Sequence, residues 1–342
     1  LEATAPIIEA QLGESLVINM INLQVTLATK ASRCFWAAGG RDLVDFSLRR
    51  TQGTDAGMKV ARASYIAGFG ATSNVMAGKL LGIPISGTMA HSFVTSFRKE
   101  IDAFRAFSET FPKNTVLLID TYDTLAGARK AVQVAREMTD RGEKLKGVRL
   151  DSGDFADLSR QVRNIFQEAG LEEVSIFASG GFDESKIEKV LGRGAEIDAF
   201  GIGTKMGVSA DAPYTDIAYK LVQYDGRPVL KLSTGKRTLV GEKQVFRRGE
   251  RNRILGDSIG LREENIPGET LLEPVMEKGK RSRNPEPLKN IRDRFLEEFA
   301  FLDESHKSLT DPALFPVDLG PELEKMQDQI VHEVIEKELG ES

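Results

Sequence analysis

The segment 85–97 places His91, one of three histidines in the chain, between a Gly-Thr pair and a serine. The apolar run 80–85 precedes it, and a helix is expected to begin close to the histidine. Backbone N–H groups at the start of a helix bind anions, and an imidazole beside them can transfer a phosphoryl group or a proton. Thr88 and Ser92 flank His91 and are candidates to contact the same ligand. The alternative is a histidine that caps a turn.

A second candidate is the segment 146–154, in which Arg149 and Asp151 alternate along an expected strand. A guanidinium binds a carboxylate or a phosphate through two parallel hydrogen bonds. Asp151 can bind ribose hydroxyls or Mg²⁺, which prefers oxygen ligands. The alternative is an internal ion pair that supports a turn. Asp120 and Asp123 follow another apolar strand and can position Mg²⁺ and pyrophosphate, although a helix cap explains Asp123 better.

Two glycine-rich segments follow the next two expected strands. Glycines let backbone N–H groups approach an anion before a helix begins. One such loop is a weak signal, because glycine pairs are common in ordinary turns, but two on successive strands indicate a phosphorylated sugar. The candidate phosphate-binding residues are Ser179, Gly180, Gly181, Gly201, Gly203 and Thr204.

The segment 45–50 combines an aromatic side chain with paired arginines. Phe46 offers a face for a flat ring, and Arg49 and Arg50 offer positive charge for an anionic group. These three residues are therefore candidates for substrate binding.

The elements that must position these residues alternate between strands and helices. Six short strands predict a parallel sheet, closed as a barrel or open. The polar clusters follow the C-terminal ends of strands, where parallel α/β folds bind ligands, and a single site made from many strand ends favours the barrel. The expected strands are 43–48, 83–85, 115–119, 147–150, 174–178 and 198–202, and the expected helices are 6–38, 55–69, 74–81, 100–111, 124–141, 155–169 and 183–191.

The remainder of the chain has a different pattern. The expected organisation is a catalytic α/β barrel over 1–210, antiparallel strands over 211–255 and a C-terminal helical extension over 256–342. Segment 219–232 reads as a hairpin with a turn at 225–228, and 238–248 as a further strand. Segments 287–301 and 321–339 predict exposed amphipathic helices.

Composition limits the possible partners. The chain has 342 residues, of which 41% are hydrophobic, and a net charge of −5. This charge gives no general attraction to nucleic acid or to a membrane surface. The single cysteine, Cys34, excludes an internal disulfide framework and fits a reducing compartment. Because no long apolar run or secretory leader is found, we expect a cytoplasmic protein, and a first residue other than methionine suggests a processed, truncated or partial chain.

Six motifs, in chain order, resemble those of the nicotinate phosphoribosyltransferase family. An ordered set of this kind is far more specific than any one motif. The resemblance implies an irregular α/β barrel of the type II phosphoribosyltransferase class with an accessory antiparallel sheet, forming a homodimer with shared active sites. It also implies that nicotinate and phosphoribosyl pyrophosphate give nicotinate mononucleotide and pyrophosphate for NAD biosynthesis, with coupled ATP hydrolysis. The motifs are 45–53, 87–92, 120–124, 148–154, 178–183 and 200–204, and the likeness spans about residues 6–250.

The resemblance also implies roles for individual residues. His91 resembles the histidine that ATP phosphorylates, Phe46 the residue that stacks on the pyridine ring, and Arg49 one that grips the pyrophosphate donor. Arg149 and Asp151 resemble the pair that holds substrate and ribose. Gly180, Gly181, Gly203 and Thr204 resemble the cradle of the product phosphate. Mg²⁺ is expected to bind through pyrophosphate, with Asp120 and Asp151 as candidate ligands and no site made by the protein alone.

Three positions bear on substrate choice and completeness. Ser73 lies where the related nicotinamide enzyme has an aspartate, and a serine there favours nicotinate because a carboxylate would repel the acid. Ser47 stands where the family often has glycine. The family's N-terminal Asp-x-Tyr-x-Leu-Thr pattern is not found, so that region is expected to be absent. The alternatives are a nicotinamide or quinolinate phosphoribosyltransferase of the same fold, or a non-catalytic phosphosugar-binding barrel.

Overall fold

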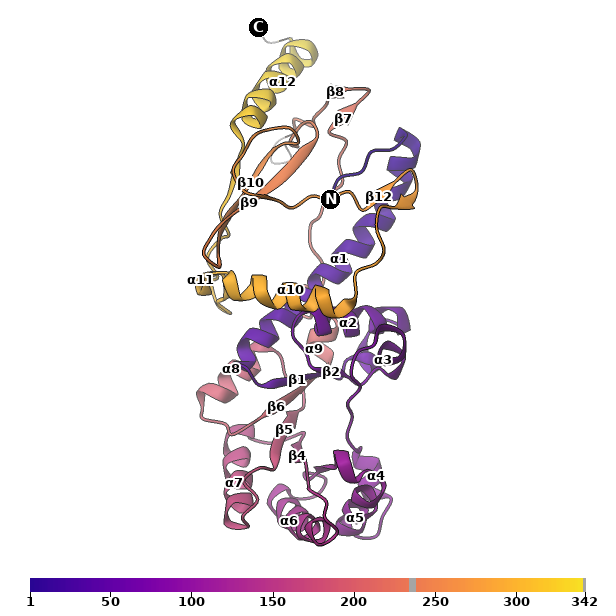
Figure 1. Cartoon of the computed structure of the whole chain (residues 1–342), viewed down its shortest axis with the longest axis vertical. Coiled ribbons are helices and arrows are strands. Elements are labelled where there is room, and N and C mark those ends of the chain that lie inside the picture. The colour runs from indigo at the N-terminus through magenta and orange to yellow at the C-terminus, as the bar shows by residue number, and fades with distance from the viewer. Residues whose placement is uncertain (234–237, 341–342) are drawn as a thin grey trace. The chain divides into compact units, whose positions relative to one another are not determined.

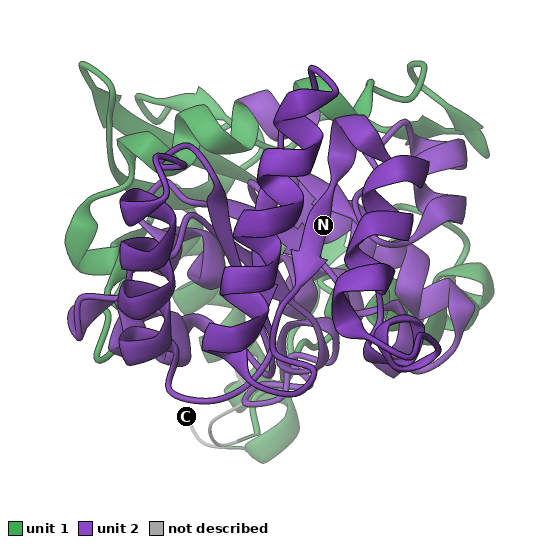
Figure 2. Ribbon diagram, turned by 90° about the horizontal axis from the view of Figure 1, so that it is seen from below, with its two compact units in different colours: residues 1–22, 216–290, 294–342 green, residues 23–215, 291–293 purple. Residues whose placement is uncertain are grey.

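The computed structural model describes residues 1–233 and 238–340, which divide into two compact units. Unit 1 comprises residues 1–22, 216–290 and 294–342, and unit 2 comprises residues 23–215 and 291–293 (Figure 2). The long helix α1 (Ile7–Ala38) contributes to both units. It confirms the expected helix over 6–38 as a single element, which ends where Gly39 and Gly40 adopt positive φ angles.

Unit 2 contains a six-stranded parallel sheet in the order β2-β1-β6-β5-β4-β3 (Figure 1). The pairing of β1 with β6 places the first strand next to the last, which is the cyclic order of a barrel. β2 and β3 end the order, so the barrel is irregular, as the resemblance implies. The strands are β1 (Asp42–Asp45), β2 (Ala71–Thr72), β3 (Val116–Leu118), β4 (Gly147–Leu150), β5 (Ser175–Ser179) and β6 (Ala199–Ile202).

Helices connect these strands, and their apolar faces bury a core rich in phenylalanine. Phe69, Phe104, Phe166, Phe182 and Phe200 are fully buried. The core is therefore made by side chains of both strands and helices. The turns at the strand ends are not needed for this core, so they can carry ligand-binding residues. The helices are α2 (Thr54–Ile66), α3 (Val75–Leu81), α4 (His91–Thr95), α5 (Glu100–Thr110), α6 (Thr124–Asp140), α7 (Phe155–Glu168), α8 (Glu184–Gly192) and α9 (Thr204–Gly207), with 3-10 turns η1 (Leu48–Arg50) and η2 (Pro112–Asn114).

One strand prediction in unit 2 was wrong, and another extended three residues too far. The segment 83–85 is not a strand: Ile85 makes only an isolated bridge to Thr72, and the strand in this part of the sheet is β2, whose two residues are too few to show alternation. The strand expected over 43–48 ends at Asp45. Its carboxylate accepts a hydrogen bond from the Ser47 N–H, an Asx turn that directs the chain into η1.

Unit 1 is built on a four-stranded sheet in the order β11-β9-β10-β14, in which β10 and β14 are parallel. The expected hairpin is present but short, and its turn residues Asp225 and Gly226 both have positive φ, as a type I′ turn requires. The strands are β7 (Gln223–Tyr224), β8 (Arg227–Pro228), β9 (Lys243–Glu250), β10 (Arg253–Leu261), β11 (Glu269–Thr270), β12 (Met276–Glu277), β13 (Lys280–Arg281) and β14 (Val317–Leu319).

The C-terminal part contains strands as well as helices. The expected boundary at 255/256 falls inside β10, and four further strands follow it, because short strands in a charged segment leave little apolar alternation to detect. The two expected amphipathic helices are confirmed as α10 (Leu288–Phe301) and α12 (Pro321–Leu339), with the short α11 (Glu304–Lys307) between them. None of the helices in the described ranges is long and apolar enough to cross a membrane.

Candidate active site

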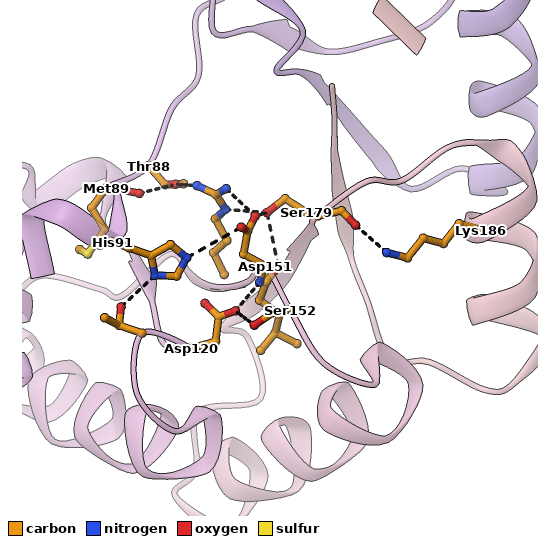
Figure 3. A network of polar contacts seen from close by, with 12 residues as sticks. Thr88, Met89, His91, Asp120, Asp151, Ser152, Ser179 and Lys186 are labelled. Atoms are coloured by element: carbon orange, nitrogen blue, oxygen red, sulfur yellow. Dashed lines mark hydrogen bonds and ion pairs between the residues drawn. The ribbon is translucent and has the colours of Figure 1, made fainter. Parts of the chain in front are cut away.

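Thr88, Asp151 and Ser179 belong to one polar network near the C-terminal ends of the unit 2 strands (Figure 3). At its centre is Arg149, which contacts all three. Its three guanidinium nitrogens donate to three different side chains. Nη2 is 2.8 Å from Asp151 Oδ1, Nε is 2.7 Å from Ser179 Oγ, and Nη1 is 2.8 Å from Thr88 Oγ1. The planar guanidinium is thus held in one orientation by β4, by β5 and by the segment before α4.

Asp151 is the carboxylate on which this network converges. Besides Arg149, it accepts a hydrogen bond from the Ser179 hydroxyl. Burial alone would raise its pKa, but the Ser179 and Arg149 hydrogen bonds and the positive charge of Arg149 outweigh burial and lower the pKa below its ordinary value. Asp151 is therefore held in its ionised form.

His91 is the first residue of α4, and its two ring nitrogens face different partners. Nδ1 lies 3.1 Å from Thr121 Oγ1, and Nε2 lies 3.8 Å from Asp151 Oδ2. The second distance is too long for a hydrogen bond but short enough for attraction between an imidazolium and the carboxylate. The His91 side chain is 44% exposed, so a ligand can reach the ring. Ser92 is exposed, and its hydroxyl takes no part in the network.

Asp120 joins the network from the end of β3. Its Oδ2 accepts from the Asp151 N–H at 2.9 Å and from the Ser152 hydroxyl at 2.6 Å. Its Oδ1 is buried and has no hydrogen-bond partner within the described residues. An unpaired buried carboxylate oxygen is suited to a cation or to a ligand hydroxyl. Asp123, in contrast, caps α6 by accepting from the Ala126 N–H, which confirms the cap interpretation.

The glycine loop after β5 lies directly against the network. Gly180 has a φ of +111°, and a Cβ on it would lie 2.1 Å from the Asp151 carbonyl oxygen, so only glycine fits. Gly181 also has a positive φ. The N–H groups of both glycines find no acceptor within the described part of the chain. Consecutive free N–H groups of this kind bind anions.

Two lysines add positive charge beside this loop. Lys186 donates from Nζ to the Gly180 carbonyl at 2.5 Å and lies over the Phe182 ring. Burial and the neighbouring charge of Lys205 lower the pKa of the Lys186 ammonium. Lys205 pairs with Asp183 at 2.6 Å. The loop therefore combines free backbone donors with two cations, a combination suited to phosphate.

The candidate phosphate-binding residues Gly201, Gly203 and Thr204 divide into two groups. Gly203 caps α9 and Thr204 opens it, next to the lysines just described. Gly201 lies inside β6, where a Cβ would come within 2.6 Å of the Phe46 ring and 2.9 Å of the Phe177 ring. The missing side chain at Gly201 thus makes room for aromatic rings, and its position within the strand differs from that of the loop glycines.

Phe46 lies beside β6, and the paired arginines follow it on η1. The Phe46 N–H donates to the Ile202 carbonyl at 2.7 Å, and the Arg149 guanidinium lies 5.4 Å from the Phe46 ring centre. Arg49 and Arg50 are exposed on η1 and form no ion pair with any described residue. Ser73 follows the last residue of β2, the strand that pairs with β1. Its N–H donates to the carbonyl of Asp45 at the end of β1.

The structure adds four residues that the sequence did not single out. Thr121 and Ser152 directly follow the predicted residues Asp120 and Asp151 in the sequence, so this adjacency could have identified them. Lys186 is on a helix six residues beyond Gly180, and Asp45 is buried at a strand end, so neither had a local signal. Within the described ranges no group of three or more His, Cys, Asp or Glu is placed to hold a metal ion.

Comparison with known proteins identifies the family. The model of the nicotinate phosphoribosyltransferase (NAPRTase) family matches residues 42–255, and that of the nicotinate phosphoribosyltransferase C-terminal domain matches residues 264–327. The chain belongs to the nicotinate phosphoribosyltransferase family. The first match contains all six predicted motifs, so the resemblance found in the sequence is confirmed.

Named members of the nicotinate phosphoribosyltransferase family are close in sequence. A nicotinate phosphoribosyltransferase of Mycobacterium tuberculosis is 49% identical over 90% of this chain, and one of Bacillus subtilis is 38% identical over 98% of it. The chain spans 66% of the length of the mycobacterial relative and 76% of the Bacillus relative.

Two solved structures share the fold. The human nicotinic acid phosphoribosyltransferase has a TM-score of 0.83 and 27% identity, with 95% of this chain and 78% of the human chain covered. The nicotinate-nucleotide pyrophosphorylase of Pyrococcus furiosus has a TM-score of 0.73 and 28% identity, with 84% and 73% covered. The irregular α/β barrel of the type II phosphoribosyltransferase class is thereby confirmed.

Proposed function

We propose that this chain transfers the phosphoribosyl group of phosphoribosyl pyrophosphate to nicotinate, giving nicotinate mononucleotide and pyrophosphate for NAD biosynthesis. One observation carries the proposal: the network of Arg149, Asp151, Ser179, Thr88, His91 and Asp120 is continuous and adjoins the glycine loop with its free N–H groups. It supplies, in one place, the charges that a phosphoribosyl transfer needs. A phosphosugar-binding barrel without catalysis would need the loop but not an ionised Asp151 beside it.

The reaction breaks the bond between ribose C1 and pyrophosphate while the pyridine nitrogen attacks C1. Positive charge develops on the sugar, and negative charge grows on the leaving pyrophosphate. Asp151, which is ionised, can stabilise the positive sugar. The exposed guanidinium groups of Arg49 and Arg50 can bind the pyrophosphate. The loop N–H groups and Lys186 then hold the 5′-phosphate, which does not react.

Asp120 and Asp151 are the residues that would hold Mg²⁺. Their oxygens are the ligands that this ion prefers, and the buried, unpartnered Asp120 Oδ1 fits such a role. When bound, Mg²⁺ adds positive charge that stabilises the leaving pyrophosphate. The chain's own contribution is to orient the two carboxylates, since Asp120 is fixed by the Asp151 N–H and the Ser152 hydroxyl.

The proposal includes ATP as a co-substrate, with His91 as the residue that accepts its phosphoryl group. The exposed ring supports this role because ATP can reach it, and the ring is oriented by Thr121 beside Nδ1 and by the Asp151 carboxylate facing Nε2. Phosphorylation would add about −1.5 to −2 charges at His91. That charge would oppose Asp151 and attract Arg149, so the network would change when ATP is used.

Nicotinate rather than nicotinamide is the proposed acceptor. Phe46 provides an aromatic face, and the adjacent Arg149 provides a cation for an acidic ring. Ser73 carries no charge, so the ring-binding segment does not repel a carboxylate. Quinolinate has two carboxylates and would need more positive charge than this arrangement supplies.

We also propose an oligomeric state and a cellular location for this protein. We expect a homodimer with shared sites, and the exposed side chains of Ile8, Leu12 and Leu16 on α1 provide apolar surface for an interface. Sedimentation of the purified chain tests this. A cytoplasmic location is likewise proposed, and cell fractionation tests it.

The test of function is an assay of the full chain with phosphoribosyl pyrophosphate and Mg²⁺. Nicotinate or nicotinamide is supplied as the acceptor, each with and without ATP. We expect mononucleotide from nicotinate, more of it with ATP, and none from nicotinamide. Product from nicotinamide alone would overturn the substrate assignment, and absence of product from both would overturn the proposed transfer. The Arg149→Met variant serves as the inactive control.

A further inference from the structure

Asp45, at the end of β1, is a buried carboxylate that the proposed reaction does not use. It is only 1% exposed, and no lysine, arginine or histidine in the described ranges forms an ion pair with it. Burial raises its pKa above the ordinary value, although hydrogen bonds from Ser47 and Thr72 oppose this effect. A buried charge without a cation is costly, so the reason for this residue must be sought in the groups that it holds.

Asp45 binds two segments that are far apart in the sequence. Oδ1 accepts from the Ser47 N–H at 2.9 Å, and Oδ2 accepts from the Thr72 hydroxyl at 2.7 Å. Its backbone carbonyl accepts from the Ser73 N–H at 2.8 Å. Thr72 continues the chain of bonds, because its Oγ1 accepts from the Asn74 N–H at 3.0 Å. One residue therefore ties the turn after β1 to the end of β2.

The residues enclosed by these bonds are the two assigned to the pyridine ring. Phe46 lies between Asp45 and Ser47, and Ser73 lies between Thr72 and Asn74. Phe46 is therefore flanked by Asp45 and by Ser47, which Asp45 binds. Ser73 is flanked by Thr72, which Asp45 binds, and by Asn74, which Thr72 binds. β1 and β2 also pair through Asp45 and Thr72, and this short ladder ends there. Beyond it, the side-chain bonds of Asp45 add to the backbone bonds from Phe46 to Ile202 and from Ser73 to Asp45.

We infer that Asp45 is a positioning residue that sets the place of Phe46 relative to Ser73 and thereby the affinity for the pyridine carboxylate. It cannot touch the substrate, because it is buried. An asparagine does not reproduce these contacts, because its single oxygen accepts from only one of the two donors and its NH₂ group would have to reverse the bond to Thr72. The inference rests on the proposed function, since it concerns the ring-binding part of that same site.

The test is steady-state kinetics of the full chain carrying Asp45→Asn. We expect the KM for nicotinate to rise about ten-fold, as loss of a hydrogen bond to a charged group predicts, and the KM for phosphoribosyl pyrophosphate to stay within about two-fold. Thr72→Val removes the hydroxyl with little change of shape, so it should also raise the KM for nicotinate. This second variant carries the test if Asp45→Asn does not fold.

Ser64→Ala is the matched control, because Ser64 is a buried hydroxyl that donates only to the Ala61 carbonyl one turn earlier in α2. It should leave both KM values unchanged. Amide hydrogen exchange should become faster at Ser47 and Ser73 in Asp45→Asn and not in Ser64→Ala. Equal changes in both KM values, or an unchanged nicotinate KM, would overturn the inference. A wild-type chain that makes no mononucleotide would instead overturn the proposed function, and the two failures are thus distinct.

Discussion

The Arg149 guanidinium and the Asp151 carboxylate form an ion pair of 2.8 Å although they lie only two residues apart at the end of β4. Alternate residues of a strand point to the same face, which brings the two side chains together. The pair does more than support a turn, because Arg149 also binds Thr88 and Ser179. Asp151 in turn keeps its second oxygen facing His91. The sequence left open whether Arg149 and Asp151 bind a ligand or form an internal ion pair. In the structure the ion pair is itself part of the candidate site.

Arg149→Lys tests the fixed geometry of this guanidinium. A lysine ammonium keeps the charge but cannot reach three partners that are arranged around a planar fork. We expect kcat/KM for nicotinate mononucleotide formation to fall about 10- to 100-fold, from the loss of one or two charged hydrogen bonds. Arg136→Lys, on the exposed face of α6, is the control and should behave like the wild type. An unchanged kcat/KM in Arg149→Lys would contradict the central role of this residue.

His91→Ala tests the proposed use of ATP. Without the imidazole no residue receives the phosphoryl group, so the stimulation of mononucleotide formation by ATP should disappear while a basal rate remains. Product formed with and without ATP is the measurement. His332→Ala, which alters an exposed histidine of α12, should keep the full stimulation. Undiminished stimulation in His91→Ala would rule out this role.

Gly180→Ala and Gly181→Ala separate steric exclusion from backbone strain. Both glycines have positive φ, so an alanine at either position costs about 1–2 kcal/mol. Only at Gly180 would the added methyl group collide with the Asp151 carbonyl, while Gly181 has open space around it. Gly180→Ala should therefore lower the melting temperature more and raise the KM for phosphoribosyl pyrophosphate more. Equal effects of the two substitutions would argue against close contact between loop and network.

Asp151 predicts how stability depends on pH. Its pKa in the folded protein is below the ordinary value of 3.8, so its ionised form stabilises the fold above that pH. This contribution is lost as the pH falls through the lowered pKa. The difference in melting temperature between wild type and Asp151→Asn should be constant at neutral pH and shrink in acid. A difference that grows in acid would show that the direction of the pKa shift is wrong.

The raised pKa of Asp45 predicts that its contribution to stability changes with pH in the opposite direction. Its pKa is raised above 3.8 by burial, so its contribution to stability is complete below that pH and declines as the pH rises through the raised pKa. Relative to the wild type, Asp45→Asn should therefore be more favourable at neutral pH than at low pH. Melting curves of both proteins from acid to neutral pH provide the measurement. If the two curves stay parallel, burial does not disfavour this carboxylate.

Local patterns predicted most of the elements in unit 2. Strand β4 and helix α6 were placed to within a residue or two, because apolar spacing, glycines and the Asp123 cap act on neighbouring residues. The strand β2 was missed because two residues carry no period. Gly201 was assigned to the phosphate site because of its residue type alone, and the rings packed against it could not be read from the chain.

The sequence by itself determined which side chains could do the chemistry and that they follow the ends of parallel strands, because both depend on residue types and short-range periodicity. Only the tertiary structure decided which of them meet. Thr88 and Arg149 are 61 residues apart, and Asp45 and Thr72 are 27 apart, yet each pair is joined by a hydrogen bond. The pairing of β1 with β6 and the packing of each side chain set these distances, and neither is encoded in the spacing of residues along the chain.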